Sequence, residues 1–127
     1  MKKVIFYFAV LIFASACKKS TTPTVHNGIT GKWKVSAYLA DPGDGSGDWQ
    51  PADPSVPGYL EFKENGSLII TPLSLNNFDH YELTSDSTLN FKKGSASFQR
   101  RYRLSTTLLT ITGGCDEACE TRYIPVQ

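Results

Sequence analysis

Three cysteines are the residues of this chain best able to do covalent chemistry, and an odd number cannot all pair with one another. Cys115 and Cys119 stand four positions apart in the stretch GGCDEACETRY. Such a pair can form a disulfide, take part in redox exchange or contribute to a metal site. Cys17 is far from both, directly after the apolar stretch AVLIFASA, and needs a separate explanation.

The residues before Cys17 have the composition of a secretory signal peptide. A basic pair at residues 2–3 precedes an apolar run at residues 4–13 and the small side chains of residues 14–16. This order is typical of an exported protein, and the apolar run is shorter than the ~20 residues of a membrane-spanning helix. We therefore predict export and the removal of residues 1–16.

The junction at Cys17 resembles the signal of bacterial lipoproteins, in which a cysteine after small residues becomes the lipidated N-terminus. Ordinary signal peptidase would also accept this site, but it would leave an exported thiol that is unusual in an oxidising compartment. We expect a lipid on Cys17, with residues 17–28 as a polar, flexible tether. The resemblance implies an outer-membrane anchor, and the lack of acidic residues directly after Cys17 favours the periplasmic face.

The second and third cysteines fit a structural role. In an exported protein a disulfide is the usual state of two nearby cysteines, so we expect Cys115 and Cys119 to pair and to pin the turn into the last strand. Redox catalysis fits less well because the spacing is not Cys-x-x-Cys, and a zinc site needs four good ligands. His26 lies in the tether and His80 in a predicted strand, so we predict no metal.

Composition argues against two further classes of function. The chain has 13 basic and 12 acidic residues, a formal net charge of +1 and no long basic run. It therefore lacks the electrostatic footprint of a nucleic-acid-binding protein. A nucleophilic enzyme is also disfavoured, because no Gly-x-Ser-x-Gly motif occurs and His80 is expected on an outer strand face. We predict no catalytic residues and no cofactor.

Short β-rich runs separated by turn residues follow the tether, without helical periodicity. We predict strands at residues 29–39, 59–63, 67–72, 78–84, 88–92, 97–104, 108–112 and 121–126, with a long irregular loop at 41–57. The Asn65-Gly66 pair is typical of a tight hairpin turn. Eight hairpin-connected strands close most simply into an all-β, antiparallel up-and-down barrel. A β-sandwich is the alternative.

Gly31-Lys32-Trp33, at the start of the first predicted strand, resembles the Gly-x-Trp motif of lipocalins. With the lipoprotein-type leader, eight strands, long first loop and Cys-x-x-x-Cys, the chain resembles the small lipocalin-like domain lipoproteins of Bacteroidota-type bacteria. The resemblance covers residues 29–127 and implies a lipocalin-like barrel closed at one end by Trp33, with Arg122 packed across the indole.

For function, the resemblance implies a monomeric, non-enzymatic protein that holds a small, largely apolar ligand in its barrel. The alternative is a structural or interaction module with a filled barrel that docks partners on its outer surface. Large inward side chains distinguish the two, because convergence of Phe62, Phe91, Phe98 and Tyr102 would fill the interior.

Two residues stand out as candidate ligand contacts. Trp49, in the long first loop, either caps a ligand at the barrel mouth or docks its loop on the rim. Arg100 shares a strand face with Phe98 and Tyr102, and an inward arginine is costly unless it is paired.

Three explanations account for Arg100: a ligand carboxylate, a bulge that turns the side chain outward, or a buried partner such as Glu82 or Glu61. Tyr102, its neighbour on the same face, completes the candidate ligand-binding set.

Overall fold

The computed structural model describes residues 28–71, 77–113 and 119–127, which form nine β-strands. The strands are β1 (Gly31–Ala40), β2 (Trp49–Pro51), β3 (Tyr59–Phe62), β4 (Leu68–Thr71), β5 (His80–Ser85), β6 (Thr88–Lys93), β7 (Ala96–Leu104), β8 (Leu109–Thr112) and β9 (Cys119–Pro125). No helix in these three ranges is long and apolar enough to cross a membrane. The predicted leader, residues 17–27 of the tether including Cys17, and Cys115 lie outside the described residues.

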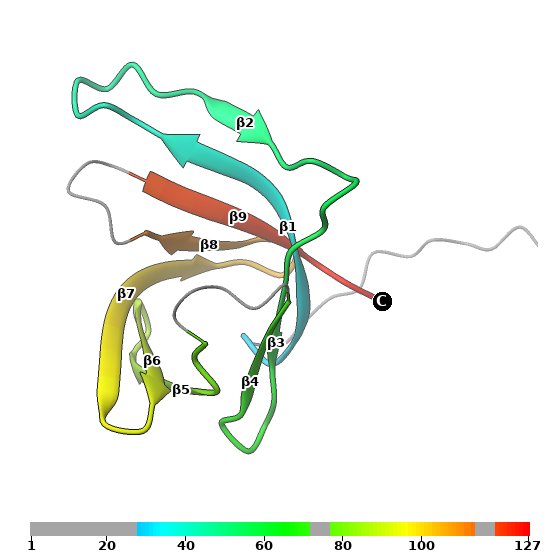
Figure 1. Cartoon of the computed structure of the whole chain (residues 1–127), viewed down its shortest axis with the longest axis vertical. Helices are drawn as coiled ribbons and strands as arrows, with labels where there is room; N and C mark the ends of the chain where they lie inside the picture. The colour runs from blue at the N-terminus through cyan, green and yellow to red at the C-terminus, as the bar shows by residue number, and fades with distance from the viewer. Residues whose placement is uncertain (1–27, 72–76, 114–118) are drawn as a thin grey trace, which may run out of the picture.

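The sheet runs in the order β4-β3-β1-β9-β8-β7-β6-β5, and every pair in it is antiparallel. Apart from β2 and the step from β4 to β5, each strand pairs with the next in sequence, and the last strand returns to the first (Figure 1). β7 turns a corner of the barrel, because residues 96–101 pair with β6 and residues 102–104 pair with β8. The predicted all-β, eight-stranded antiparallel up-and-down lipocalin-like barrel is confirmed.

The barrel is nearly closed, and its seam lies between β4 and β5. The described residues join across this seam through a single bridge, between Ser67 and His80. Two backbone hydrogen bonds flank it, from Leu68 N–H to the Asp79 carbonyl at 2.8 Å and from Tyr81 N–H to the Gly66 carbonyl at 2.9 Å. Backbone pairing across the seam is therefore limited to this bridge rather than a full ladder, and the Tyr81 hydroxyl adds a hydrogen bond to the Lys63 carbonyl at 2.8 Å.

The short strand β2 lies within the predicted irregular loop and pairs with the second half of β1. The preceding turn is shaped by Asp41, whose carboxylate accepts backbone N–H bonds from Gly43, Gly45 and Gly47 at 2.7, 3.0 and 3.1 Å. These bonds favour the ionised carboxylate and lower the pKa of Asp41. A β-carbon at Gly47 would lie 2.6 Å from that of Asp41, so the turn requires glycine there.

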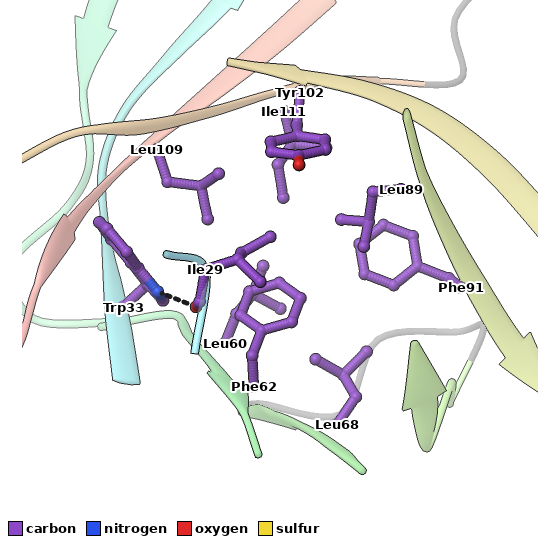
Figure 2. Packing of buried hydrophobic residues seen from close by; sticks show 10 residues of the cluster. All are labelled: Ile29, Trp33, Leu60, Phe62, Leu68, Leu89, Phe91, Tyr102, Leu109 and Ile111. Atoms are coloured by element: carbon purple, nitrogen blue, oxygen red, sulfur yellow. Dashed lines mark hydrogen bonds between the residues drawn. The ribbon is translucent and has the colours of Figure 1, made fainter. Parts of the chain in front are cut away.

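The core closes one end of the barrel around Trp33. Its side chain is fully buried, and its indole N–H donates to the Ile29 carbonyl at 2.7 Å (Figure 2). Ile29 itself is 3% exposed, so the segment before β1 is part of the plug. The buried cluster consists of Ile29, Trp33, Leu60, Phe62, Leu68, Leu89, Phe91, Tyr102, Leu109 and Ile111.

Three of the four large side chains expected to converge inward, Phe62, Phe91 and Tyr102, lie in this core, whereas Phe98 is 44% exposed. Leu83 lies opposite the fully buried Leu89, yet it is 44% exposed. It belongs to the part of β5 beyond the bridge at His80, where β4 supplies no neighbouring ladder among the described residues. Leu83 is therefore exposed because no described strand pairs with this part of β5 on the side of the seam.

Candidate ligand cavity at one end of the barrel

A cavity of about 250 Å³ lies inside the barrel. Its lining is largely apolar and comes from Leu60, Ile70, Phe78, Phe91, Phe98, Arg100, Ile111, Thr112, Gly113, Thr121 and Tyr123. The cavity begins next to the plug: on β3, Leu60 lies opposite Trp33 and lines the cavity. On β9, Pro125 lies opposite Trp33, whereas Tyr123 and Thr121, nearer the start of the strand, line the cavity. One end of the barrel is therefore packed solid and the other is hollow.

Arg100 lines this cavity from β7 and is half-buried. The ladder between β6 and β7 runs without a register shift and places Arg100 opposite the fully buried Leu89, so no bulge turns it outward. Glu82 forms an ion pair with Lys92, and Glu61 lies 4.0 Å from Lys63. Both acids contact other cations, and no ion pair of Arg100 is found among the described residues. The bulge is therefore wrong, and the part of the chain that the structure describes supplies no acidic partner for Arg100.

Aromatic rings form the wall beside Arg100. The ring of Phe78 stacks on Phe91 with centroids 5.8 Å apart and lies 5.5 Å from the ring of Phe98. Phe98 is 44% exposed and lies opposite Phe91, so it stands at the open side of the wall. The guanidinium carbon of Arg100 lies 5.2 Å from the Phe98 centroid, within the range of a cation–π contact.

Tyr123 and Thr121 bring hydroxyl groups to the cavity from β9. Burial raises the pKa of the Tyr123 phenol to about 12, because a phenolate would lose its hydration there. The phenol is therefore neutral at physiological pH and able to donate a hydrogen bond. Among the described residues that line the cavity, Arg100 alone is charged.

The structure corrects the assignment of Tyr102 as a ligand contact. Its ring is 7% exposed and packs in the core cluster, two positions further along β7 than Arg100 (Figure 2). Its hydroxyl approaches the Ser85 carbonyl at 3.5 Å, at the limit of a hydrogen bond. Burial raises its pKa as well. Tyr102 fills the barrel next to the cavity but does not line it.

Arg122 contacts Trp49, whereas the sequence analysis predicted a different contact for each of these residues. The guanidinium carbon of Arg122 lies 3.7 Å from the centroid of Trp49, so the predicted stack of Arg122 on Trp33 is wrong. The reason is alternation on β9, because Arg122 points away from the face of Tyr123 that lines the cavity. Trp49 likewise does not cap the cavity, and the alternative that it docks its loop on the barrel is supported.

The remaining candidates lie apart from the cavity. His80 is on the outer face, exposed, with its Nδ1 atom 2.7 Å from Asp79. The described residues contain no group of three or more His, Cys, Asp or Glu side chains placed to hold a metal. Cys119 begins β9, where its carbonyl accepts from the Gly113 N–H at 2.6 Å. Its pairing with Cys115 stays a prediction.

Comparison with known proteins adds no relative. No protein-family model matches the chain, and no curated protein or solved structure matches it. Function must therefore be inferred from the barrel and its cavity. Sequence reasoning missed Tyr123, although alternation in the last predicted strand could have found it, since Thr121, Tyr123 and Pro125 share a face.

Proposed function

We propose that the protein is a lipid-anchored, non-enzymatic binding protein of the lipocalin-like type that holds a small, largely apolar ligand in its barrel. The single observation that carries this proposal is the cavity of about 250 Å³ between Arg100 and Tyr123. Small eight-stranded barrels have an interior that side chains either fill or leave for one small ligand. Here the core fills the end around Trp33 and leaves the other end hollow.

The lining supports an apolar ligand. Leucine, isoleucine and phenylalanine side chains supply most of the wall. The polar side chains that line the space are the guanidinium of Arg100, the hydroxyl-bearing residues Thr121 and Tyr123 of β9, and Thr112 at the end of β8. Binding sites for small molecules generally have this composition, with apolar walls for affinity and few polar groups for orientation. The cavity is smaller than the roughly 300–1,000 Å³ of pockets for drug-sized ligands, which favours a small molecule.

The anchor is the second part of the proposal. The basic, apolar and small segments before Cys17 support export and lipidation, and residues 17–28 would tether the barrel to the outer membrane on the periplasmic side. A diacylated N-terminus keeps a protein at a membrane without a spanning helix. The barrel would then act as a monomer close to the lipid surface.

A filled interaction module is the second candidate, and one observation favours it. Phe62, Phe91 and Tyr102 do converge in the core, as that alternative required, and are 1%, 9% and 7% exposed. Phe98 does not join them, because it is 44% exposed and lines the cavity instead. The hollow end beside Phe98 is the reason to prefer ligand binding.

Native mass spectrometry of the full chain released from envelope membranes tests both parts. The mature mass should correspond to a chain that begins at an acylated Cys17, and gentle ionisation should retain a small molecule that organic solvent extracts. Ile70→Trp, which fills the cavity, should abolish the retained mass. Ile69→Trp is the matched control, because Ile69 is 43% exposed on the opposite face of the same strand. An empty wild-type barrel would favour the interaction module.

A further inference from the structure

The charge inside the cavity points to the chemical class of the ligand. We infer that the ligand carries one carboxylate, held by Arg100, on an apolar body that occupies the rest of the cavity. This inference rests on the proposed binding function and goes beyond it, since an apolar cavity alone would accept neutral molecules as well.

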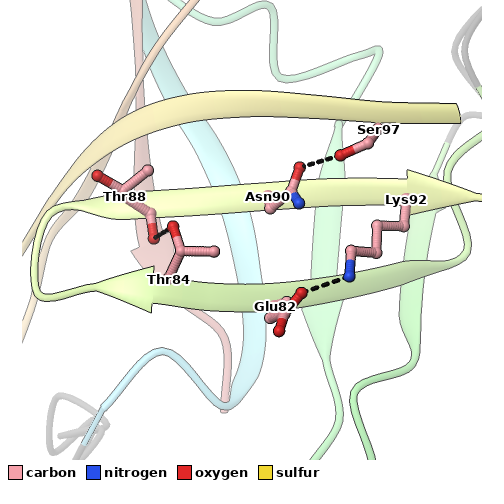
Figure 3. A network of polar contacts seen from close by, with 6 residues as sticks. All are labelled: Glu82, Thr84, Thr88, Asn90, Lys92 and Ser97. Carbon is pink, nitrogen blue, oxygen red and sulfur yellow. Dashed lines mark hydrogen bonds and ion pairs between the residues drawn. The ribbon is translucent and has the colours of Figure 1, made fainter.

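Arg100 brings a charge that the protein does not neutralise within the cavity. None of the described lining residues is acidic, and the neutral phenol of Tyr123 adds no negative charge. β6 and β8, the two strands that flank β7, contain no acidic residue. Glu82 on β5 contacts Lys92 on β6, beside the hydrogen bond between Asn90 and Ser97 (Figure 3).

The hydrogen-bonding capacity of Arg100 is also largely unused. A guanidinium has five N–H donors in a planar fork, and in this side chain one nitrogen, Nη1, donates to the Gln99 carbonyl at 2.9 Å. No other hydrogen-bond acceptor for it is found among the described residues. The contact with the Phe98 ring orients the guanidinium without using its in-plane donors. The fork is thus held in place and available to a ligand.

The size of the charge favours a carboxylate over a phosphate. Paired N–H donors of arginine match the two oxygens of either group. A carboxylate carries one negative charge, which a single guanidinium balances, whereas a phosphate monoester carries about 1.5 to 2 at neutral pH. With no second cation among the described lining residues, the excess charge of a phosphate would be left uncompensated in an apolar cavity.

The placement of apolar and polar groups also fits an amphipathic acid. Arg100 stands beside the half-exposed Phe98, while Leu60 and Ile111 on other strands are buried. A ligand with its carboxylate at Arg100 would place its apolar body against these buried side chains. The neutral hydroxyls of Thr121 and Tyr123 could receive a second polar group without requiring one.

Octanoate, octan-1-ol, octylamine and octyl phosphate are suitable probes because they share one apolar chain and differ in head group. Each is titrated by calorimetry into the full chain in lipid nanodiscs, so that no detergent competes, with the heats on empty nanodiscs subtracted. Wild-type protein should bind octanoate about tenfold more tightly than octanol, as expected for a charge-assisted hydrogen bond, and more tightly than octyl phosphate. Octylamine should bind most weakly.

Arg100→Gln removes the charge and keeps a shorter, neutral polar side chain. It should abolish the preference for octanoate while leaving the affinity for octanol within about twofold, which also shows that the variant is folded. Arg101→Gln is the matched control, because Arg101 is exposed, lies opposite Thr88 and does not line the cavity. It should retain the full preference.

Three outcomes would overturn the inference. If wild type binds octanol as tightly as octanoate, the carboxylate is wrong while the apolar binding function stands. If Arg100→Gln keeps the preference, or octyl phosphate binds best, the pairing of Arg100 with a carboxylate is wrong. If none of the four probes binds above the empty-nanodisc heats, the proposed function fails together with the inference.

Discussion

Arg122 on β9 stacks on Trp49 of β2 across the intervening strand β1, with the guanidinium carbon 3.7 Å from the indole centroid. Arg122 lies opposite Ala37 and Trp49 opposite Leu39, so the pair reaches diagonally over β1. The Nε atom of Arg122 is buried without a hydrogen-bond partner in the described part of the chain. Contact with the indole therefore compensates in part for the desolvated cation and holds the short strand β2 on the barrel.

A double-mutant cycle measures this stack. Trp49→Ala and Arg122→Lys should each lower the free energy of unfolding by about 1–2 kcal/mol, and the double variant should lose less than their sum by roughly 0.5–1 kcal/mol. Lysine at position 122 should not preserve the stabilising contact with the indole, because it keeps the charge but lacks the planar group that lies on the ring. Urea denaturation followed by circular dichroism gives the four values.

The same cycle with Trp33 in place of Trp49 is the control. Trp33 and Arg122 belong to opposite faces of the barrel wall, so Trp33→Ala and Arg122→Lys should add within about 0.5 kcal/mol. Strong coupling between Trp33 and Arg122 would contradict the face assignment of β9.

Much of the barrel could be predicted because strand alternation and turn residues are local signals. The eight main strands and their antiparallel order follow from such runs, as the hairpin at Asn65-Gly66 illustrates. β2 could not be predicted, because a three-residue strand that ends in proline has no pattern of its own and forms by pairing with β1. The partner of Arg122 depends on register and on the bulge between Val35 and Ala37, which also leave no local signal.

The cavity shows the same limit. Alternation correctly placed Arg100 on the inner face, because that inference requires only the neighbours Phe98 and Tyr102 on one strand. Alternation alone could not show which of these inward residues fill the core and which line the cavity. That distinction depends on side chains from distant strands, such as Phe78 against Phe98.

Trp33 is expected to be among the most costly side chains to truncate. Trp33→Ala should lower the free energy of unfolding by about 3–5 kcal/mol, because it opens a large cavity in a fully buried position. Trp33→Phe should cost about 1–3 kcal/mol, since it keeps much of the packing but leaves the buried Ile29 carbonyl without its donor. Urea denaturation checks both, and a cost below about 1 kcal/mol for the alanine variant would contradict a closed end plugged by this indole.

The predicted disulfide between Cys115 and Cys119 is expected to add little stability. Thiol labelling of the exported protein under denaturing, non-reducing conditions should find neither cysteine reactive. Reduction should lower the free energy of unfolding by roughly 2 kcal/mol, because the loop it closes is short. The pairing of Thr112 with Glu120 already joins β8 to β9 at this end. Loss of folding on reduction would show a larger role than we assign.

Tyr123 makes stability depend on pH in the alkaline range. Its pKa in the folded protein is raised to about 12 from the ordinary tyrosine value of 10.0, so the unfolded chain releases this proton first. The contribution of the neutral phenol is fully present below pH ~10 and is lost as the pH rises towards 12. The loss amounts to at most about 2–3 kcal/mol, because each tenfold change in the ionisation constant corresponds to roughly 1.4 kcal/mol.

Tyr123→Phe isolates this contribution, because the variant cannot ionise. The free energy of unfolding of wild type should fall more steeply between about pH 10 and 12 than that of Tyr123→Phe, as measured by urea denaturation. Tyr59→Phe is the matched control, since Tyr59 is half-buried on β3, does not line the cavity and is not among the groups that raise the pKa of Tyr123, and it should keep the wild-type slope. Absorbance at high pH should show a late tyrosine ionisation in wild type that is lost in Tyr123→Phe, while the raised pKa of Tyr102 is common to both proteins. Parallel stability curves for wild type and Tyr123→Phe would mean that this phenol is hydrated, and that the cavity is wetter than its apolar walls indicate.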